Sequence, residues 1–227
     1  MASISALFII ILAIPSFIAM IIWLGWKKGL ISIIILSIYT LSIETFAIIT
    51  GFPYSSFHYT ELIGMKLFGL TPFTLPFAYV PLFMGCIYLA NQYWQEDLPY
   101  WKNILKLVII IALLVLTADL ILDPAAVSLN FWVYEYTGIF YGVPLQNFFG
   151  WILTGIIAAL IGLLLFKKEL ISLKIPAISS SLFLIISFWT AVCLYRQLWL
   201  PGIIGVLFVI FILNKTKGKV GDFELIK

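Results

Sequence analysis

Charge is scarce in this chain. Charged residues make up 10% of its 227 residues, hydrophobic residues make up 63%, and the mean hydropathy is +1.16. A soluble globular domain does not have that composition. We therefore interpret the chain as a polytopic membrane protein.

Side chains that bind metals or carry redox chemistry are also rare. His58 is the single histidine, which excludes a multi-histidine metal site. Cys86 and Cys193 lie singly in apolar stretches, without metal-ligand or CxxC spacing, and are interpreted as packing residues. The sequence also lacks a phosphate-binding loop and a nucleotide fingerprint. We expect neither a metal nor a cofactor.

Long apolar stretches recur along the whole chain. A membrane-spanning helix needs about 20 apolar residues. The pattern predicts an all-α integral membrane protein, one polytopic domain over residues 1–227 with about seven transmembrane helices. The predicted helices lie near 4–24, 29–50, 72–93, 104–122, 146–166, 176–195 and 198–213.

Lysine and arginine are distributed unevenly between the two sides of this bundle. Lys66 and Arg196 fall on one side, and the remaining basic residues fall on the other. Basic residues favour the cytoplasmic side, so we expect the N-terminus outside, the C-terminus in the cytoplasm and no nucleic-acid partner. The residues on the expected cytoplasmic side are Lys27, Lys28, Lys102, Lys106, Lys167, Lys168, Lys174, Lys215, Lys217, Lys219 and Lys227.

Glu44 lies inside the second apolar stretch. A charged carboxylate at mid-bilayer costs roughly 2.5 to 3.5 kcal/mol, so such residues usually face the bundle interior. Ser37 and Thr40 share a helical face with Glu44, which should therefore point inward. Glu44 is a candidate catalytic residue, and the structural alternative is a hydrogen bond to a neighbouring helix.

Asp119 and Asp123 are one helical turn apart at the end of the fourth predicted helix. Because they share a face, they can share a proton or a hydrogen-bonded water. Desolvation and like-charge repulsion both favour the neutral acid, so we expect at least one to be protonated near neutral pH. A helix-ending turn at Asp123-Pro124 is the structural alternative.

Two long loops, 51–71 and 123–145, are rich in glycine, proline and aromatic residues. Both are expected on the outer side, folded back against the bundle. An aromatic belt at the membrane interface also produces such a composition. Neutral acids beside aromatic rings in a dry cavity can protonate an alkene, because the ring faces stabilise the resulting carbocation.

Two sequence blocks carry a resemblance to a known family. The first is Glu44-Thr45, Thr50-Gly51-Phe52-Pro53-Tyr54, Phe57-His58-Tyr59-Thr60 and Leu67-Phe68-Gly69. The second is Asp119, Leu122-Asp123-Pro124, Trp132, Gly138, Tyr141-Gly142-Val143-Pro144, Asn147-Phe148 and Gly150-Trp151. Together, over residues 40 to 151, they resemble the membrane carotenoid 1,2-hydratase family, which includes hydratases that complete bacterioruberin.

The resemblance implies a cofactor-independent hydro-lyase of the cell membrane. It would add water across the terminal double bond of an acyclic carotenoid, with membrane lipid as the other partner and an oligomeric state that the sequence does not define. We expect Asp119 or Asp123 to protonate the alkene and Glu44 to position or deprotonate water. The expected substrate-binding residues are Tyr54, His58, Tyr59, Trp132, Glu135, Tyr141, Asn147 and Trp151.

Other functions fit parts of this pattern. A carotenoid cyclase would use the same cation, and a lipid or proton-coupled carrier would use membrane acids without transforming the lipid. A retinal protein is disfavoured because the stretch 198–213 contains no lysine for a Schiff base.

Overall fold

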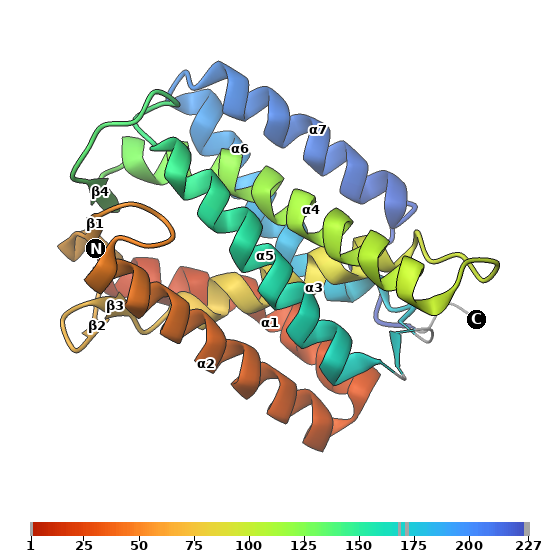
Figure 1. The fold of residues 1–227 in the computed structure, drawn as a ribbon. Helices are drawn as coiled ribbons and strands as arrows, with labels where there is room; N and C mark the ends of the chain where they lie inside the picture. Colours follow the sequence, from red (N-terminus) through yellow and green to blue (C-terminus); the bar gives the residue numbers. More distant parts are fainter. Residues whose placement is uncertain (1, 168, 171–172, 225–227) are drawn as a thin grey trace.

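The protein is a bundle of α-helices with short strands at one end (Figure 1). The computed structural model describes residues 2–167, 169–170 and 173–224. Within these residues there are seven α-helices, each overlapping a predicted range: α1 Ala2–Leu24, α2 Trp26–Thr50, α3 Leu75–Asn91, α4 Tyr100–Ser128, α5 Leu145–Phe166, α6 Ser180–Tyr195 and α7 Trp199–Lys215. Two 3₁₀ turns, η1 Glu61–Ile63 and η3 Pro176–Ser179, complete the helical part.

Five of the described helical segments are long and apolar enough to cross a membrane. They include α1, α2, α4 and α5, and the fifth joins η3 to α6 as Pro176–Tyr195. The helices α3 and α7 are apolar but have 17 residues each. The chain is therefore an all-α membrane protein.

The central helix is α3. Most of its side chains are buried, and it packs against α1, α2, α4 and α6. A helix that is hydrophobic on every face belongs in the interior of a bundle. This central position places Tyr79, on the first half of α3, inside the protein.

The helix α4 differs from its predicted range of 104–122. It begins at Tyr100 and continues to Ser128, so Asp123-Pro124 does not end it and the prediction of a loop from residue 123 was wrong. Pro124 removes one backbone donor, but Ala125 and Ala126 beyond it are fully buried. Packing against neighbouring helices lets a transmembrane helix continue past a proline. Asp119 and Asp123 therefore lie on one uninterrupted helix.

Two pairs of short strands lie at one end of the bundle. Strand β1 (Phe57–Tyr59) pairs with β4 (Trp132–Tyr134) in antiparallel register, and β2 (Lys66–Leu67) pairs with β3 (Thr71–Pro72). The β1–β4 pair joins the two long loops to each other. Tyr54, Phe57 and Tyr59 are buried, which confirms that the first loop folds back against the bundle.

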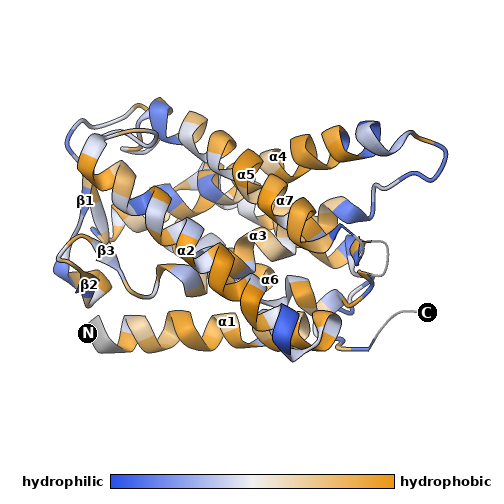
Figure 2. Cartoon of the chain, turned by 60° about the horizontal axis from the view of Figure 1, so that its bottom comes forward, coloured by the Kyte–Doolittle hydropathy of each residue, from blue (hydrophilic) through white to orange (hydrophobic). Residues whose placement is uncertain are grey.

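The two ends of the bundle differ in charge. The connections after α1, α3 and α5 and the end of α7 lie opposite the strands (Figure 1). Figure 2 shows hydrophilic residues concentrated toward the ends of the bundle and apolar residues along the helices. The described lysines expected in the cytoplasm lie on these connections, on the tail and on the adjoining ends of α2, α4 and α7, whereas Lys168 and Lys227 fall outside the described residues. Lys28 forms an ion pair with Glu169 there at 2.6 Å.

Candidate functional site

Glu44 is held between two tyrosines from separate elements. Tyr59 of β1 donates its hydroxyl hydrogen to Oε1 of Glu44 at 2.5 Å, and Tyr79 of α3 donates to Oε2 at 3.0 Å. Glu44 is 2% exposed, and all three side chains are buried. A carboxyl group that accepts a hydrogen bond on each oxygen is held in a fixed orientation.

The hydroxyls that share the face of Glu44 serve the helix itself. Ser37 donates to the carbonyl of Ile33, and Thr40 donates to the carbonyl of Ser37. Thr40 is fully buried, as expected for this face. Contact between Glu44 and the rest of the site therefore runs through Tyr59 and Tyr79.

Asp119 and Asp123 form a second cluster with Asn147 at the start of α5. The Asn147 amide nitrogen donates to Oδ2 of Asp119 at 2.8 Å and to Oδ2 of Asp123 at 2.6 Å. Only the NH₂ group of an amide can donate to both acceptors, so the carboxyl groups fix the orientation of Asn147. Tyr134 of β4 donates to the same Asp123 oxygen at 2.6 Å.

The second carboxyl oxygen of Asp119, Oδ1, is buried without a hydrogen-bond partner among the described residues. A buried polar atom without a partner costs about 1 to 3 kcal/mol. Such an atom in a membrane helix is typical of a functional site.

Aromatic rings connect the two clusters. The ring of Phe57 lies between those of Tyr59, at 5.5 Å, and Tyr134, at 5.7 Å. Trp132 packs against Tyr59 at 5.7 Å. The register of β1 and β4, which sets Phe57 opposite Tyr134 and Tyr59 opposite Trp132, produces this arrangement.

A further set of rings supports Tyr79 from α5. Trp151 lies 5.0 Å from the Tyr79 ring and stacks on Tyr54 at 5.6 Å. The Tyr54 hydroxyl forms a 2.6 Å hydrogen bond with the Thr154 hydroxyl. Gly150 makes room for Tyr54, because a Cβ at Gly150 would lie 2.6 Å from the Tyr54 ring. The supporting rings are thus packed too closely to move freely.

The tyrosines on the loops keep their hydroxyl hydrogens. Burial raises the pKa of Tyr59 well above its ordinary value, and the charge of Glu44 acts in the same direction. Burial also raises the pKa of Tyr134, with Asp123 adding to the effect. Both hydroxyls are therefore hydrogen-bond donors to carboxyl groups.

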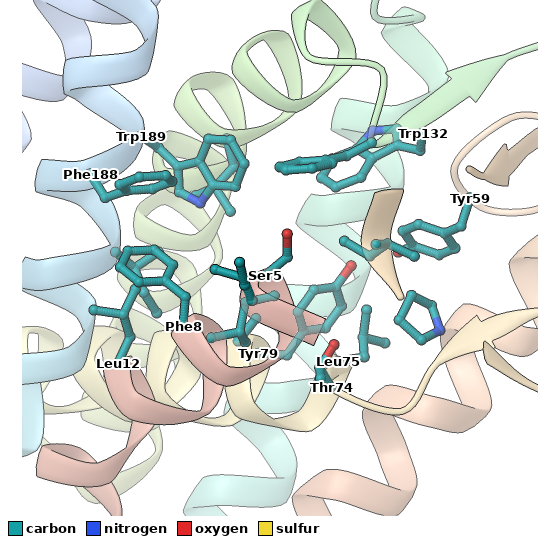
Figure 3. A pocket seen from close by; sticks show the side chains of 18 residues that line it. Ser5, Phe8, Leu12, Tyr59, Thr74, Leu75, Tyr79, Trp132, Phe188 and Trp189 are labelled. Carbon is teal, nitrogen blue, oxygen red and sulfur yellow. The ribbon is translucent and has the colours of Figure 1, made fainter. Parts of the chain in front are cut away.

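A mostly apolar cavity of about 300 Å³ adjoins the site. Tyr59 and Tyr79 line it on the Glu44 side, and Trp132 and Trp189 lie on opposite sides of it (Figure 3). Leu122, the residue before Asp123, is also part of the wall. The cavity therefore borders Leu122, one chain neighbour of Asp123, and the hydrogen-bond partners of Glu44.

Three predicted binding residues lie apart from these clusters. His58 is exposed, on the outer face of β1, and Glu135 is exposed after β4. Tyr141 is 40% exposed, and its hydroxyl accepts from the backbone nitrogen of Leu200 at 3.4 Å. The structure brings Tyr54, Tyr59, Trp132, Asn147 and Trp151 together with the three acids.

Two residues of the site had no distinct signal in the sequence. Tyr79 is an isolated tyrosine in an apolar helix, and Tyr134 is one aromatic among many in its loop. The alternation of Trp132 and Tyr134 was the available sign that both side chains face one side of a strand. Among the described residues, no group of three histidine, cysteine, aspartate or glutamate side chains is placed to hold a metal ion.

Comparison with known proteins gives one family and one curated relative. The model of a family described as "carotenoid biosynthesis protein" matches residues 4–212. A bisanhydrobacterioruberin hydratase from Haloarcula japonica is 36% identical over 90 residues, which cover 38% of this chain and 30% of that protein. The match thus spans less than a third of the relative's length. No solved structure matches the chain.

Proposed function

Since the chain belongs to the carotenoid biosynthesis protein family, we propose that it is a membrane enzyme that hydrates an acyclic carotenoid. Water would add across the terminal carbon–carbon double bond of a lycopene-like or fifty-carbon substrate. The observation that carries this proposal is a set of three buried acids tied to tyrosine and asparagine side chains, with Glu44 linked through Tyr59 and Tyr79 to an apolar cavity. The relative's name supports hydration as the reaction.

Hydration of an alkene needs an acid and a base in one site. A proton adds to one carbon of the double bond, and its partner carbon becomes a tertiary carbocation. The oxygen of water bonds to that cation and gives one proton to a base, so that the product is a tertiary alcohol. General acid and base groups each contribute about 10² to 10⁴ in rate.

The acid in this proposal is the pair Asp119 and Asp123. Asn147 donates to both carboxyl groups and keeps them together, and two carboxyl groups bonded to the same amide nitrogen share a proton more easily than they hold two negative charges. The Asp119 oxygen without a partner is the position from which this proton would leave. Tyr134 holds Asp123 in place.

The base is Glu44, which acts through Tyr59 and Tyr79. Both hydroxyls donate to Glu44, so a water in the cavity can pass a proton to a tyrosine while that tyrosine passes its own to the carboxylate. The faces of Trp132 and Tyr59 stabilise the cation electrostatically. This assignment requires no metal and no organic cofactor.

The proposal includes the orientation of the chain in the cell membrane. We place all seven helices across the bilayer, with the strands and the cavity at the outer side and the lysine-rich end in the cytoplasm. A 17-residue helix is about 26 Å long, close to the hydrocarbon thickness of about 30 Å. The central position of α3 also shields it from lipid.

Expression in cells that accumulate lycopene, or an anhydro fifty-carbon precursor, tests this function. We expect pigments heavier than the substrate by the mass of one or two waters. Asp119→Asn, matched for expression in the membrane, should give none of them. A product of unchanged mass but altered spectrum would identify a cyclase, and unchanged pigment would contradict enzymatic activity.

A further inference from the structure

The cavity lies between two helices that are joined firmly at one point. The backbone nitrogen of Ser16 on α1 donates to the Ser181 hydroxyl at 3.1 Å, and the nitrogen of Ser181 on α6 donates to the Ser16 hydroxyl at 3.2 Å. The Ser16 hydroxyl also donates to the carbonyl of Ile178 at 2.8 Å. These reciprocal bonds hold α1 against the start of α6.

Toward the strand end of the bundle the contact between these helices changes. The cavity is lined there by Phe8 and Leu12 of α1 and by Phe188 and Trp189 of α6 (Figure 3). The rings of Phe8 and Phe188 lie 4.9 Å apart. An apolar contact between two side chains separates more easily than the hydrogen-bonded joint at Ser16.

The outer surface beside this contact is apolar. Ile4, Leu7 and Ile11 of α1 and Leu184 of α6 are exposed on the protein surface. In a membrane protein such residues face the lipid tails. A ligand dissolved in the membrane would reach the Phe8–Phe188 contact without crossing a polar layer.

The size and lining of the cavity restrict what it holds. Its volume of about 300 Å³ is at the lower limit of pockets that enclose small ligands, which range from about 300 to 1,000 Å³. A forty- or fifty-carbon chain does not fit inside, but one end of it does. Tyr59, Tyr79 and Thr74 are among the few polar side chains in the wall, and the two tyrosines lead to Glu44.

From these observations we infer that the cavity binds one end group of a linear polyene, which enters sideways from the membrane between α1 and α6. This inference rests on the proposed function, and it adds the location of the end group and its route. The remainder of the polyene stays in the lipid beside Phe8 and Phe188. Each end of a symmetrical substrate would therefore react in a separate binding event.

Filling the cavity tests the location of the end group. Leu12 lines the cavity and its neighbour Ile11 is exposed to lipid, so Leu12→Trp and Ile11→Trp place the same side chain on the two faces of α1. Purified protein in lipid vesicles is incubated with lycopene and, in a parallel experiment, with an anhydro fifty-carbon precursor, and both the pigment retained and the hydrated product are measured. We expect Leu12→Trp to lower both at least tenfold and Ile11→Trp to leave both within twofold of the unaltered protein.

The two readouts separate failure of the inference from failure of the proposed function. If the unaltered protein forms product and Leu12→Trp forms as much, the cavity is not the site, although the hydratase function stands. If the unaltered protein retains either pigment but converts neither, and Leu12→Trp does not retain them, the hydratase function fails while the site stands. If neither protein retains either pigment, both the inference and the proposed function are overturned.

Closing the gap between the helices tests the route. The variant Phe8→Cys with Phe188→Cys is bridged by a short, cleavable thiol reagent before lycopene is added. Bridging should reduce turnover at least tenfold, and cleavage of the reagent should restore it, which shows that the variant is folded. Each single cysteine variant, treated in the same way, controls for reaction at Cys86 and Cys193. Full turnover of the bridged protein would overturn the lateral route.

Discussion

Tyr79 donates its hydroxyl hydrogen to Oε2 of Glu44 at 3.0 Å, and the same side chain lines the cavity. Glu44 itself is buried behind this tyrosine and Tyr59. The carboxyl group is therefore one hydrogen bond away from the wall of the cavity. Tyrosine hydroxyls between an acid and its substrate both position the acid and carry protons to it.

Removal of the Tyr79 hydroxyl should impair turnover without harming the fold. Tyr79→Phe keeps the ring that packs on Trp151 and removes one donor to Glu44. We expect hydrated product to fall about 10- to 100-fold, which corresponds to about 1.4 to 2.7 kcal/mol of transition-state stabilisation. Tyr88→Phe, also buried on α3 but outside the site, is the control. Equal activity of the two variants would contradict a role for the Tyr79 hydroxyl.

Glu44→Gln should leave protonation of the alkene intact and block the capture of water by the cation. The acid can still form the cation, but no base accepts the proton of the attacking water, so hydrated product should fall about 10² to 10⁴-fold. In deuterated water the cation loses a proton again, and recovered substrate should contain deuterium detectable by mass spectrometry. Substrate recovered without deuterium would indicate that Glu44 acts before or during protonation.

Asp119→Asn should abolish both hydration of the substrate and exchange of deuterium into it. The Asn side chain still offers an oxygen to Asn147 but has no acidic proton, so the cation does not form. We expect neither hydrated product nor deuterium in recovered substrate. Asp123→Asn should behave in the same way because the proton belongs to the pair. If either variant still exchanges deuterium at the normal rate, the residue replaced in it is not part of the acid that protonates the alkene.

Gly150→Ala should destabilise the protein. The added Cβ would lie 2.6 Å from the Tyr54 ring and 2.8 Å from the carbonyl oxygen of Pro53. Overpacking of this kind costs about 1 to 3 kcal/mol, visible as a lower thermal midpoint in detergent. At Gly221 a Cβ would meet nothing within 4 Å, so Gly221→Ala should keep the midpoint. The same midpoint for both variants would mean that α5 moves to accommodate the methyl group.

Labelling of introduced cysteines from each side tests the orientation. His58→Cys lies on the strand end and Lys217→Cys follows α7 at the opposite end. In intact cells a membrane-impermeant thiol reagent should label the first, and the second only after the membrane is opened. The buried Cys86 and Cys193 provide the background. Labelling of both variants in intact cells would contradict an odd number of crossings.

Each α-helix in the described part of the chain overlaps a range predicted from the sequence, and Glu44 is buried as expected, because apolar length and the cost of a charge in lipid are local properties. The sequence also predicted which face of α4 points inward, since Asp119 and Asp123 are one turn apart, and both are buried. The residue at which α4 ends could not be predicted from the sequence. Proline after Asp123 normally indicates a turn, whereas α4 continues past it to Ser128 with Ala125 and Ala126 fully buried.

The side chains that contact the three acids were harder to predict than the acids themselves. Tyr59 and Trp132 were expected to contact the substrate from the resemblance, but Tyr79 and Tyr134 look like any interfacial tyrosine. The contact of Tyr134 depends on the pairing of β1 with β4, two strands of three residues each, in which the alternation of Trp132 and Tyr134 is the only periodic signal. The cavity depends on how α1 meets α6, a contact between segments more than 160 residues apart.

The pairing of β1 with β4 also has a consequence for how this protein can change over evolution. Tyr59 reaches Glu44 from one strand, and Tyr134 reaches Asp123 from the other, in a register that the two strands set together. A chimera that takes one of these two loops from a relative and keeps the other loop of this protein would misalign both tyrosines at once. The two loops therefore behave as a single inherited unit, and transplanting both should preserve activity where transplanting either alone destroys it.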